Sequence, residues 1–173
     1  MSVSKRCIRQ SNVKLDEVFT PYEAVMPLIP YLPKDWTIWE CAFGQGYLAK
    51  HLTNLGYKVV GSGENFFNAK LDCNVLVTNP PYSLKDNFIE RAYSLHKPFA
   101  FLLPLTALEG KRRGYLYREN GIQLIIPNKR INFIIPSGKT ANWFQTAWFC
   151  YGLNLPKDLM FVDYFTGRKG EVK

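Results

Sequence analysis

The chain of 173 residues is long enough for one domain of ordinary size and leaves little room for a second. Hydrophobic residues make up 47% of it, with 12 Phe, 10 Tyr and 4 Trp, and this composition excludes both intrinsic disorder and a small disulfide-stapled scaffold. The 22 Lys and Arg residues outnumber the 14 Asp and Glu residues, which gives a net charge of +8. That excess favours an anionic partner, nucleic acid first, over the alternative of a merely soluble basic surface.

Cysteine spacing and hydropathy place the chain in a reducing, aqueous compartment. Cys7, Cys41, Cys73 and Cys150 lie far apart and form no Cys-x-x-Cys pair, so we expect buried, reduced thiols and no metal site. The first 14 residues are polar and basic, and the longest apolar run, residues 99–108, is too short to span a bilayer. We therefore expect a cytoplasmic protein that does not engage a membrane.

The two ends of the chain differ in character from its middle. Residues 1–18 are basic and poor in large apolar side chains, which is typical either of a partner-dependent arm or of a frayed terminus. Residues 166–173 form a second basic tail, and residues 19–165 contain the apolar segments of the domain. We expect the first helix to start with Thr20 as its N-cap and Glu23 completing a capping box.

Apolar periodicity predicts the remaining elements. We expect strands over residues 36–39, 58–61, 75–78, 99–103, 124–126, 130–135 and 143–151, and helices near residues 47–55, 84–96 and 109–119. Strands that alternate with helices are typical of a parallel sheet covered on both faces. The sequence thus predicts a single α/β domain of Rossmann type with a mostly parallel, doubly wound sheet.

A glycine-rich turn follows the first of these strands. It reads Glu-Cys-Ala-Phe-Gly-Gln-Gly over residues 40–46, with an acidic residue at the strand end and a Gly-x-Gly pair. Glycines at the first strand–helix turn of a doubly wound sheet allow a cofactor to approach the backbone closely. The third glycine of the dinucleotide fingerprint is absent, so a purely structural turn is the better interpretation of this motif taken by itself.

A second motif, Asn79-Pro80-Pro81-Tyr82, follows the apolar strand at 75–78 directly and therefore falls at the same sheet edge. Consecutive prolines fix the backbone and donate no N–H group. The side-chain oxygen of Asn79 and the carbonyl of Pro80 can accept both hydrogens of an exocyclic amine, while the Tyr82 ring offers a stacking face. Such a clamp would orient the amine nitrogen toward an electrophile.

With these motifs in this order, the chain resembles S-adenosylmethionine-dependent methyltransferases that act on adenine N6, in particular the small DNA enzymes of bacteria and phages. That family carries a Phe-x-Pro motif, an acidic glycine turn and an (Asn/Asp/Ser)-Pro-Pro-(Tyr/Phe) motif. Here they are residues 19–21, 40–46 and 79–82. The resemblance covers roughly residues 16–165 and implies the class I methyltransferase version of the Rossmann-like fold.

The resemblance also implies how S-adenosylmethionine binds. Thr20 and Pro21 would seat its methionine end, Glu40 would bind its ammonium group, and Gly44 and Gly46 would let it lie against the turn. The cofactor-binding residues implied in this way are Phe19, Thr20, Pro21, Glu40, Cys41, Ala42, Phe43, Gly44 and Gly46. The methyl group would pass to an amine held by the catalytic motif, Asn79, Pro80, Pro81 and Tyr82.

The sequence departs from the family pattern at two motifs. Cys41 stands where the glycine turn usually has proline, and the second strand ends without the acidic residue that contacts the cofactor ribose. Glu64, Asn65 and Phe66 follow shortly afterwards, and they stand either for the ribose acid or for the next motif, which contacts the adenine. No target-recognition domain is expected, so any sequence specificity must come from loops, the basic arm, a protein partner or a homo-oligomer.

Basic residues near aromatic ones are candidates for nucleic-acid contacts. Lys111, Arg112 and Arg113 form the densest cluster, and Arg130 and Trp143 follow later in the chain. The alternative is a solvated helix face with core aromatics, which we prefer for Trp148 and Phe149.

The combined hypothesis is methylation of adenine N6 in nucleic acid, with DNA favoured over RNA. The same clamp can hold the amide of a protein glutamine, and the missing ribose acid also fits a binding subunit that has lost turnover. Adenine in RNA, a protein glutamine amide and an inactive nucleic-acid-binding subunit therefore remain the alternatives.

Overall fold

The computed structural model describes residues 18–61 and 63–164. The strands are β1 (Thr37–Trp39), β2 (Lys58–Val60), β3 (Val75–Thr78), β4 (Phe99–Pro104), β5 (Gln123–Pro127), β6 (Phe133–Ile134), β7 (Thr140–Ala141), β8 (Thr146–Tyr151) and β9 (Leu159–Val162). The α-helices are α2 (Tyr22–Val25), α3 (Tyr47–Asn54), α4 (Lys85–Ser94) and α5 (Lys111–Asn120), and the 3₁₀ helices are η2 (Met26–Tyr31), η3 (Tyr82–Leu84) and η4 (Leu105–Leu108). None of the helices in this described part is long and apolar enough to cross a membrane.

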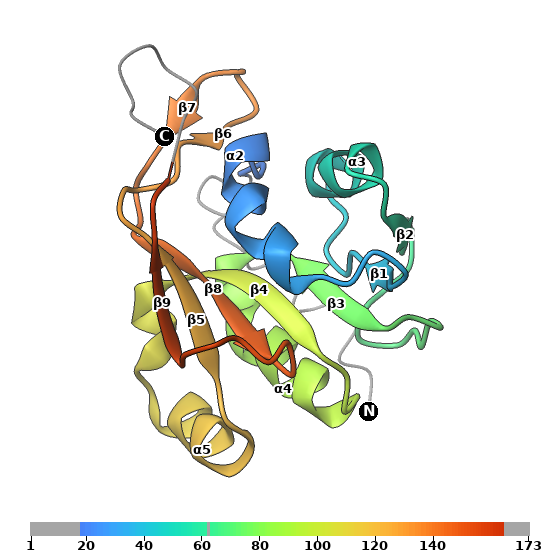
Figure 1. Ribbon diagram of the computed structural model, residues 1–173, viewed down its shortest axis with the longest axis vertical. Helices are drawn as coiled ribbons and strands as arrows, with labels where there is room; N and C mark the ends of the chain where they lie inside the picture. The colour runs from blue at the N-terminus through green and yellow to red at the C-terminus, as the bar shows by residue number, and fades with distance from the viewer. Residues whose placement is uncertain (1–17, 62, 165–173) are drawn as a thin grey trace.

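Seven strands form one sheet in the order β2-β1-β3-β4-β8-β5-β9 (Figure 1). Only β8 runs antiparallel to its neighbours, β4 and β5, so the sheet is mostly parallel as predicted. The chain moves outward from β1 to β2 and then returns to the other side of β1 with β3. Ligands of doubly wound sheets bind at such a switch point, at the carboxyl ends of the strands.

Both faces of the sheet are covered, which explains the continuous apolar runs in its central strands. Along β4, Ala100 and Leu102 pack with α2, η2 and α3, whereas Phe99, Phe101 and Leu103 pack with α4 and α5 on the other face. All five of these side chains are fully buried. The predicted single α/β domain with helices on both faces is therefore confirmed.

The predicted start of the first helix is wrong by one residue. Helix α2 begins at Tyr22, its N-cap is Pro21 with an extended backbone (ψ 158°), and no side chain caps it. Tertiary contacts explain the later start, because Phe19 pairs with Ile134 in an isolated antiparallel bridge and Thr20 is buried. The chain therefore stays extended through residue 21 instead of turning at Thr20.

The second half of the sheet contains elements that periodicity did not reveal. The strand predicted over residues 130–135 shrinks to the two residues of β6, which pair with β7 in a hairpin, and the last predicted strand begins at Thr146. Strands β7 and β9 were not expected at all. Both are short, and β9 is an edge strand with only alternate residues partly covered, so neither has a continuous apolar signature.

The ends of the chain and one cysteine lie outside the described residues. Residues 1–17 of the predicted arm, with Cys7 among them, and the predicted tail at residues 166–173 are not described. The other three cysteines, Cys41, Cys73 and Cys150, are free and buried, as predicted.

Gly61, directly after β2, is required by close packing beneath the glycine turn. Its φ is +117°, and an added Cβ would lie 2.4 Å from the Trp39 ring and 2.6 Å from the carbonyl oxygen of Glu40. Gly56 also has a positive φ, +88°, but open space around it. We expect Gly61→Ala to lower the free energy of unfolding by about 2 kcal/mol more than Gly56→Ala, since overpacking is added to backbone strain. Urea denaturation of both variants measures this difference, and equal losses would contradict it.

Candidate active site

A cavity of about 350 Å³ opens at the carboxyl ends of β1 and β3, the switch point of the sheet. This volume lies within the range of small-molecule sites. The cavity is lined by Val18, Phe19, Thr20, Glu40, Ala42, Phe43, Gly44, Gln45, Tyr47, Leu48, Asn79, Pro81 and Pro136. The structure thus brings together the three motifs that the sequence analysis singled out, although they are separated by up to 60 residues.

The glycine turn between β1 and α3 depends on two left-handed residues. Gly44 has φ +50° and Gly46 has φ +76°, and the Gly46 N–H donates to the Phe43 carbonyl at 2.8 Å. A Cβ on Gly46 would lie 2.9 Å from the Phe43 ring, so the tight turn needs a glycine there. Helix α3 then begins at Tyr47, directly beside the cavity.

Glu40 is a buried carboxyl group in the wall of the cavity. Its Oε1 atom accepts hydrogen bonds from the Ala42 N–H at 3.0 Å and from the Thr78 hydroxyl. Burial raises the pKa of Glu40 from 4.5 to about 7, against the lowering effect of these two bonds. The described residues supply no cation within ion-pair distance of this carboxylate. A bound cationic group would therefore restore its charge, which makes Glu40 a suitable partner for an ammonium ion.

Asn79 carries the second unusual polar group of the cavity. Its Nδ2 atom donates to the Val18 carbonyl at 3.5 Å, which turns Oδ1 the other way. Oδ1 is buried and has no hydrogen-bond partner among residues 18–61 and 63–164. An acceptor buried without a partner is costly, so a ligand that donates an N–H group to it is the simplest explanation for its retention.

The rest of the Asn-Pro-Pro-Tyr motif forms the frame around Asn79. Pro81 lines the cavity, and Pro80 is buried behind it. The Tyr82 ring is only 9% exposed and packs edge-on against Phe144, with ring centroids 5.6 Å apart. Its expected stacking face is therefore largely covered in this conformation.

A third wall comes from the segment before α2. The Phe19 ring stacks on Tyr47 with centroids 4.7 Å apart and an angle of 5°, and the Thr20 carbonyl lies 3.2 Å from Nε2 of His51. Pro136, beyond β6, completes this side. Six residues at the site were not expected from the sequence: Thr78 and the lining residues Val18, Gln45, Tyr47, Leu48 and Pro136. Position alone could have indicated Tyr47, which follows the glycine turn, and Thr78, which ends β3, whereas no sequence signal indicated Pro136.

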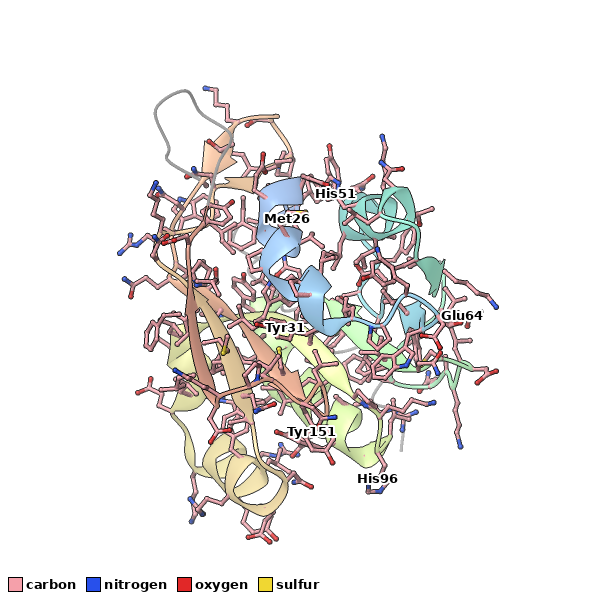
Figure 2. All side chains as sticks on the ribbon, viewed as in Figure 1. Met26, Tyr31, His51, Glu64, His96 and Tyr151 are labelled. Atoms are coloured by element: carbon pink, nitrogen blue, oxygen red, sulfur yellow. The ribbon has the colours of Figure 1, made fainter. Side chains whose placement is uncertain are left out.

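Several predicted cofactor contacts do not reach this cavity. Phe66 is core, with its ring centroid 5.3 Å from that of Trp39 and 4.9 Å from that of Phe88, and Asn65 accepts the Phe67 N–H with its side chain. Glu64 is exposed beyond β2 (Figure 2). Cys41 is buried below the turn, where its thiol contacts the Trp39 carbonyl at 3.4 Å. Phe66 packs on Trp39 of β1 and Phe88 of α4, so its side chain belongs to the core on the α4 side of the sheet and not to the cavity.

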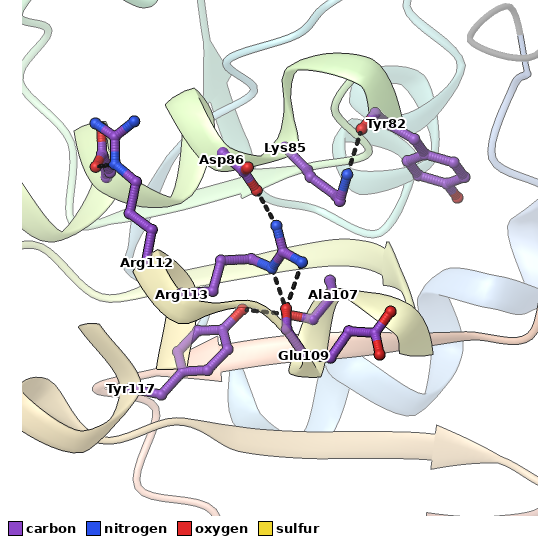
Figure 3. Close-up of polar contacts among 9 residues, drawn as sticks. Tyr82, Lys85, Asp86, Ala107, Glu109, Arg112, Arg113 and Tyr117 are labelled. Atoms are coloured by element: carbon purple, nitrogen blue, oxygen red, sulfur yellow. Dashed lines mark hydrogen bonds and ion pairs between the residues drawn. The ribbon is translucent and has the colours of Figure 1, made fainter. Parts of the chain in front are cut away.

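The predicted phosphate cluster on α5 is largely engaged within the protein (Figure 3). Arg112 pairs with Glu90, and Arg113 pairs with Asp86 and donates to the carbonyls of Ala107 and Glu109. The Arg113 side chain is only 12% exposed. These contacts fasten α5 to α4, so we correct the expectation for Arg113 to a structural role. Lys111 remains exposed, as do Arg130 and Trp143.

Comparison with known proteins gave similarity at the level of the fold. No protein family model matches the chain, and no curated protein matches its sequence. Among solved structures, a proposed RNA methyltransferase, PH1948 from Pyrococcus horikoshii, aligns with a TM-score of 0.53 and 11% identity over 81% of this chain and 88% of that one.

Two further structures show weaker similarity. A modification subunit of a proposed type I restriction enzyme from Vibrio vulnificus aligns with a TM-score of 0.48 and 12% identity, over 95% of this chain and 51% of that one. The tRNA (m1A58) methyltransferase TrmI from Aquifex aeolicus aligns with a TM-score of 0.44 and 14% identity, over 78% of this chain and 69% of that one. With the sheet order and switch-point cavity described above, the chain is a single domain with the Rossmann-like fold of class I methyltransferases.

Proposed function

We propose that this protein is an S-adenosylmethionine-dependent methyltransferase that modifies the exocyclic N6 amine of adenine in nucleic acid, with DNA as the preferred substrate. The observation that carries the proposal is the pairing of two polar groups in one cavity. Among the described residues, Glu40 is a buried acid without a cation, and Asn79 carries a buried acceptor without a donor. They lie at the ends of adjacent strands, where a cofactor and an amine would meet.

The residues of the cavity fit S-adenosylmethionine. Glu40 would bind its ammonium group, and Gly44, whose added Cβ would lie no closer than 3.7 Å to other protein atoms outside its chain neighbours, leaves space for it against the turn. When bound, the cofactor supplies a methyl group activated by an adjacent sulfonium. Phe19 and Tyr47 close one side of the cavity and reduce the access of water.

The amine would be held at the other strand end. Its two N–H groups would donate to Asn79 Oδ1 and to the Pro80 carbonyl, which leaves the nitrogen lone pair directed away from both acceptors. The lone pair itself would be the nucleophile, so the attack needs no general base. As the nitrogen–methyl bond forms and the methyl–sulfur bond breaks, the cofactor would leave as the neutral thioether S-adenosylhomocysteine, and the positively charged methylated nitrogen would then release one proton to solvent. The contribution of this chain is orientation and electrostatic stabilisation.

The proposal is tested by methyl transfer from labelled S-adenosylmethionine into separate DNA, RNA and protein pools, followed by identification of the modified nucleoside or amino acid. We expect N6-methyladenine in the DNA pool. Label confined to glutamine in protein, or to RNA, would overturn the substrate. Cofactor binding by calorimetry without transfer into any pool would overturn the activity itself.

A further inference from the structure

The segment between β5 and β8, residues 128–145, borders the cavity on its cofactor side. It carries the β6–β7 hairpin, which stands beside α2 at one end of the molecule (Figure 1). The Phe19 N–H donates to the Ile134 carbonyl at 2.7 Å, and the Ile134 N–H donates back at 3.0 Å. Pro136 then lines the cavity. The hairpin is thus hydrogen-bonded to the wall that closes the proposed cofactor site.

The same segment also reaches the amine side. Phe144 packs edge-on against Tyr82, and the Gln145 carbonyl accepts the Leu105 N–H at 2.9 Å, which holds the end of the segment against the carboxyl end of β4. Trp143, the neighbour of Phe144, is 47% exposed. Residues 128–145 therefore line the cavity through Pro136 and contact the Asn-Pro-Pro-Tyr motif through Phe144, whose chain neighbour Trp143 is a large aromatic residue open to solvent.

All charged side chains of this segment are basic. Residues 128–145 contain Lys129, Arg130 and Lys139 and no Asp or Glu. Arg130 and Lys139 are exposed, and no carboxylate of residues 18–61 or 63–164 lies within ion-pair distance of them. This contrasts with α5, where Arg112 and Arg113 are paired with acids. Positive charge that is not neutralised nearby attracts a polyanion most strongly.

We propose that residues 128–145 form the surface that binds the nucleic-acid strand carrying the target base. Arg130 and Lys139 contact its phosphates, and Trp143 stacks on a base next to the target. This inference rests on the proposed function and adds to it the surface on which the nucleic-acid substrate binds. A strand held here passes the mouth of the cavity, so a base extruded from it can enter toward Asn79.

The charge part is tested with the full chain and a fluorescently labelled single-stranded DNA oligonucleotide that contains one adenine. The binding constant is measured against salt concentration for the parent, for Arg130→Gln/Lys139→Gln, and for Lys58→Gln/Lys157→Gln. The last variant loses the same charge at exposed residues on the amino-end edge of the sheet. We expect the log–log slope to fall by about 1.4 in the first variant, at roughly 0.7 for each phosphate contact with a single strand, and to stay near the parent value in the second.

The stacking part is tested with Trp143→Ala and Trp143→Phe. We expect the alanine variant to raise KM for the oligonucleotide about tenfold with kcat little changed, because one base–aromatic stack is lost, and the phenylalanine variant to recover most of the affinity. A residue needed only for folding would lower the Tm and would not produce this split between KM and kcat.

A slope that falls equally in both charge variants, or in neither, overturns the assignment of this surface while the proposed function stands. Unchanged KM in Trp143→Ala overturns the stacking role. Absence of nucleic-acid binding by the parent, with methyl transfer into protein, overturns both the surface and the proposed substrate.

Discussion

Glu40→Gln is expected to weaken S-adenosylmethionine binding by at least about 10²-fold at pH 8, because it leaves the ligand's ammonium group buried without a counter-charge. The amide keeps the shape of the side chain and can still accept from the Ala42 N–H and the Thr78 hydroxyl. Calorimetry with the parent and the variant measures the loss. Glu119→Gln, the same exchange at an exposed position on α5, is the control.

The same substitution is expected to stabilise the ligand-free protein. The pKa of Glu40 rises from 4.5 to about 7 on folding, so the folded state binds more protons between these values. Stability of the parent therefore falls as pH rises from about 4.5 to 7 and stays low above that. The variant lacks this loss, and its free energy of unfolding at pH 8 should exceed that of the parent by about 3 kcal/mol. Urea denaturation at pH 5 and pH 8 measures it.

Together these two results separate a binding role from a structural one. If the carboxyl group of Glu40 were present because it stabilises the fold, Glu40→Gln would be less stable than the parent at pH 8. Unchanged cofactor affinity with increased stability would remove Glu40 from the cofactor site and leave its burial unexplained.

Asn79→Ala is expected to lower the rate of methyl transfer by about 10² or more while cofactor affinity stays the same. Oδ1 of Asn79 is the buried acceptor without a partner among the described residues, and its loss leaves one N–H group of the amine unbound. The Glu40 side of the cavity does not depend on it. Single-turnover transfer at saturating substrate measures the rate, and calorimetry measures the affinity.

Asn87→Ala provides the matched control, since Asn87 is exposed on α4. Near-normal turnover in Asn79→Ala would show that this oxygen does not hold the amine. Loss of cofactor binding together with turnover would indicate that the variant disturbs the contact with Val18 rather than the clamp.

The sequence by itself determined the fold class and the central motifs. Buried strands such as β3 and β4 are unbroken apolar runs, and the acidic glycine turn and the Asn-Pro-Pro-Tyr motif each follow such a strand. Because parallel strands end at one edge of the sheet, these motifs had to lie near each other. Gly44 and Gly46 could be placed for the same local reason, since a tight turn between a strand and a helix requires positive φ.

Only the tertiary structure decided which other residues join the site. Three contacts each join residues more than 20 positions apart. Phe19 pairs with Ile134 in extended conformation, and Arg113 forms an ion pair with Asp86. Phe66, which local patterns leave open, is buried between the rings of Trp39 and Phe88. Hydrogen bonding in a two-residue strand and ion pairing between two helices have no periodic signature. Both depend on how the sheet positions the segments that pack on it. The basic cluster on α5 is therefore partly neutralised by acids of α4, which its own sequence does not indicate. The basic segment at residues 128–145 shows the reverse, because the role that we propose for its charges depends on its place beside the cavity.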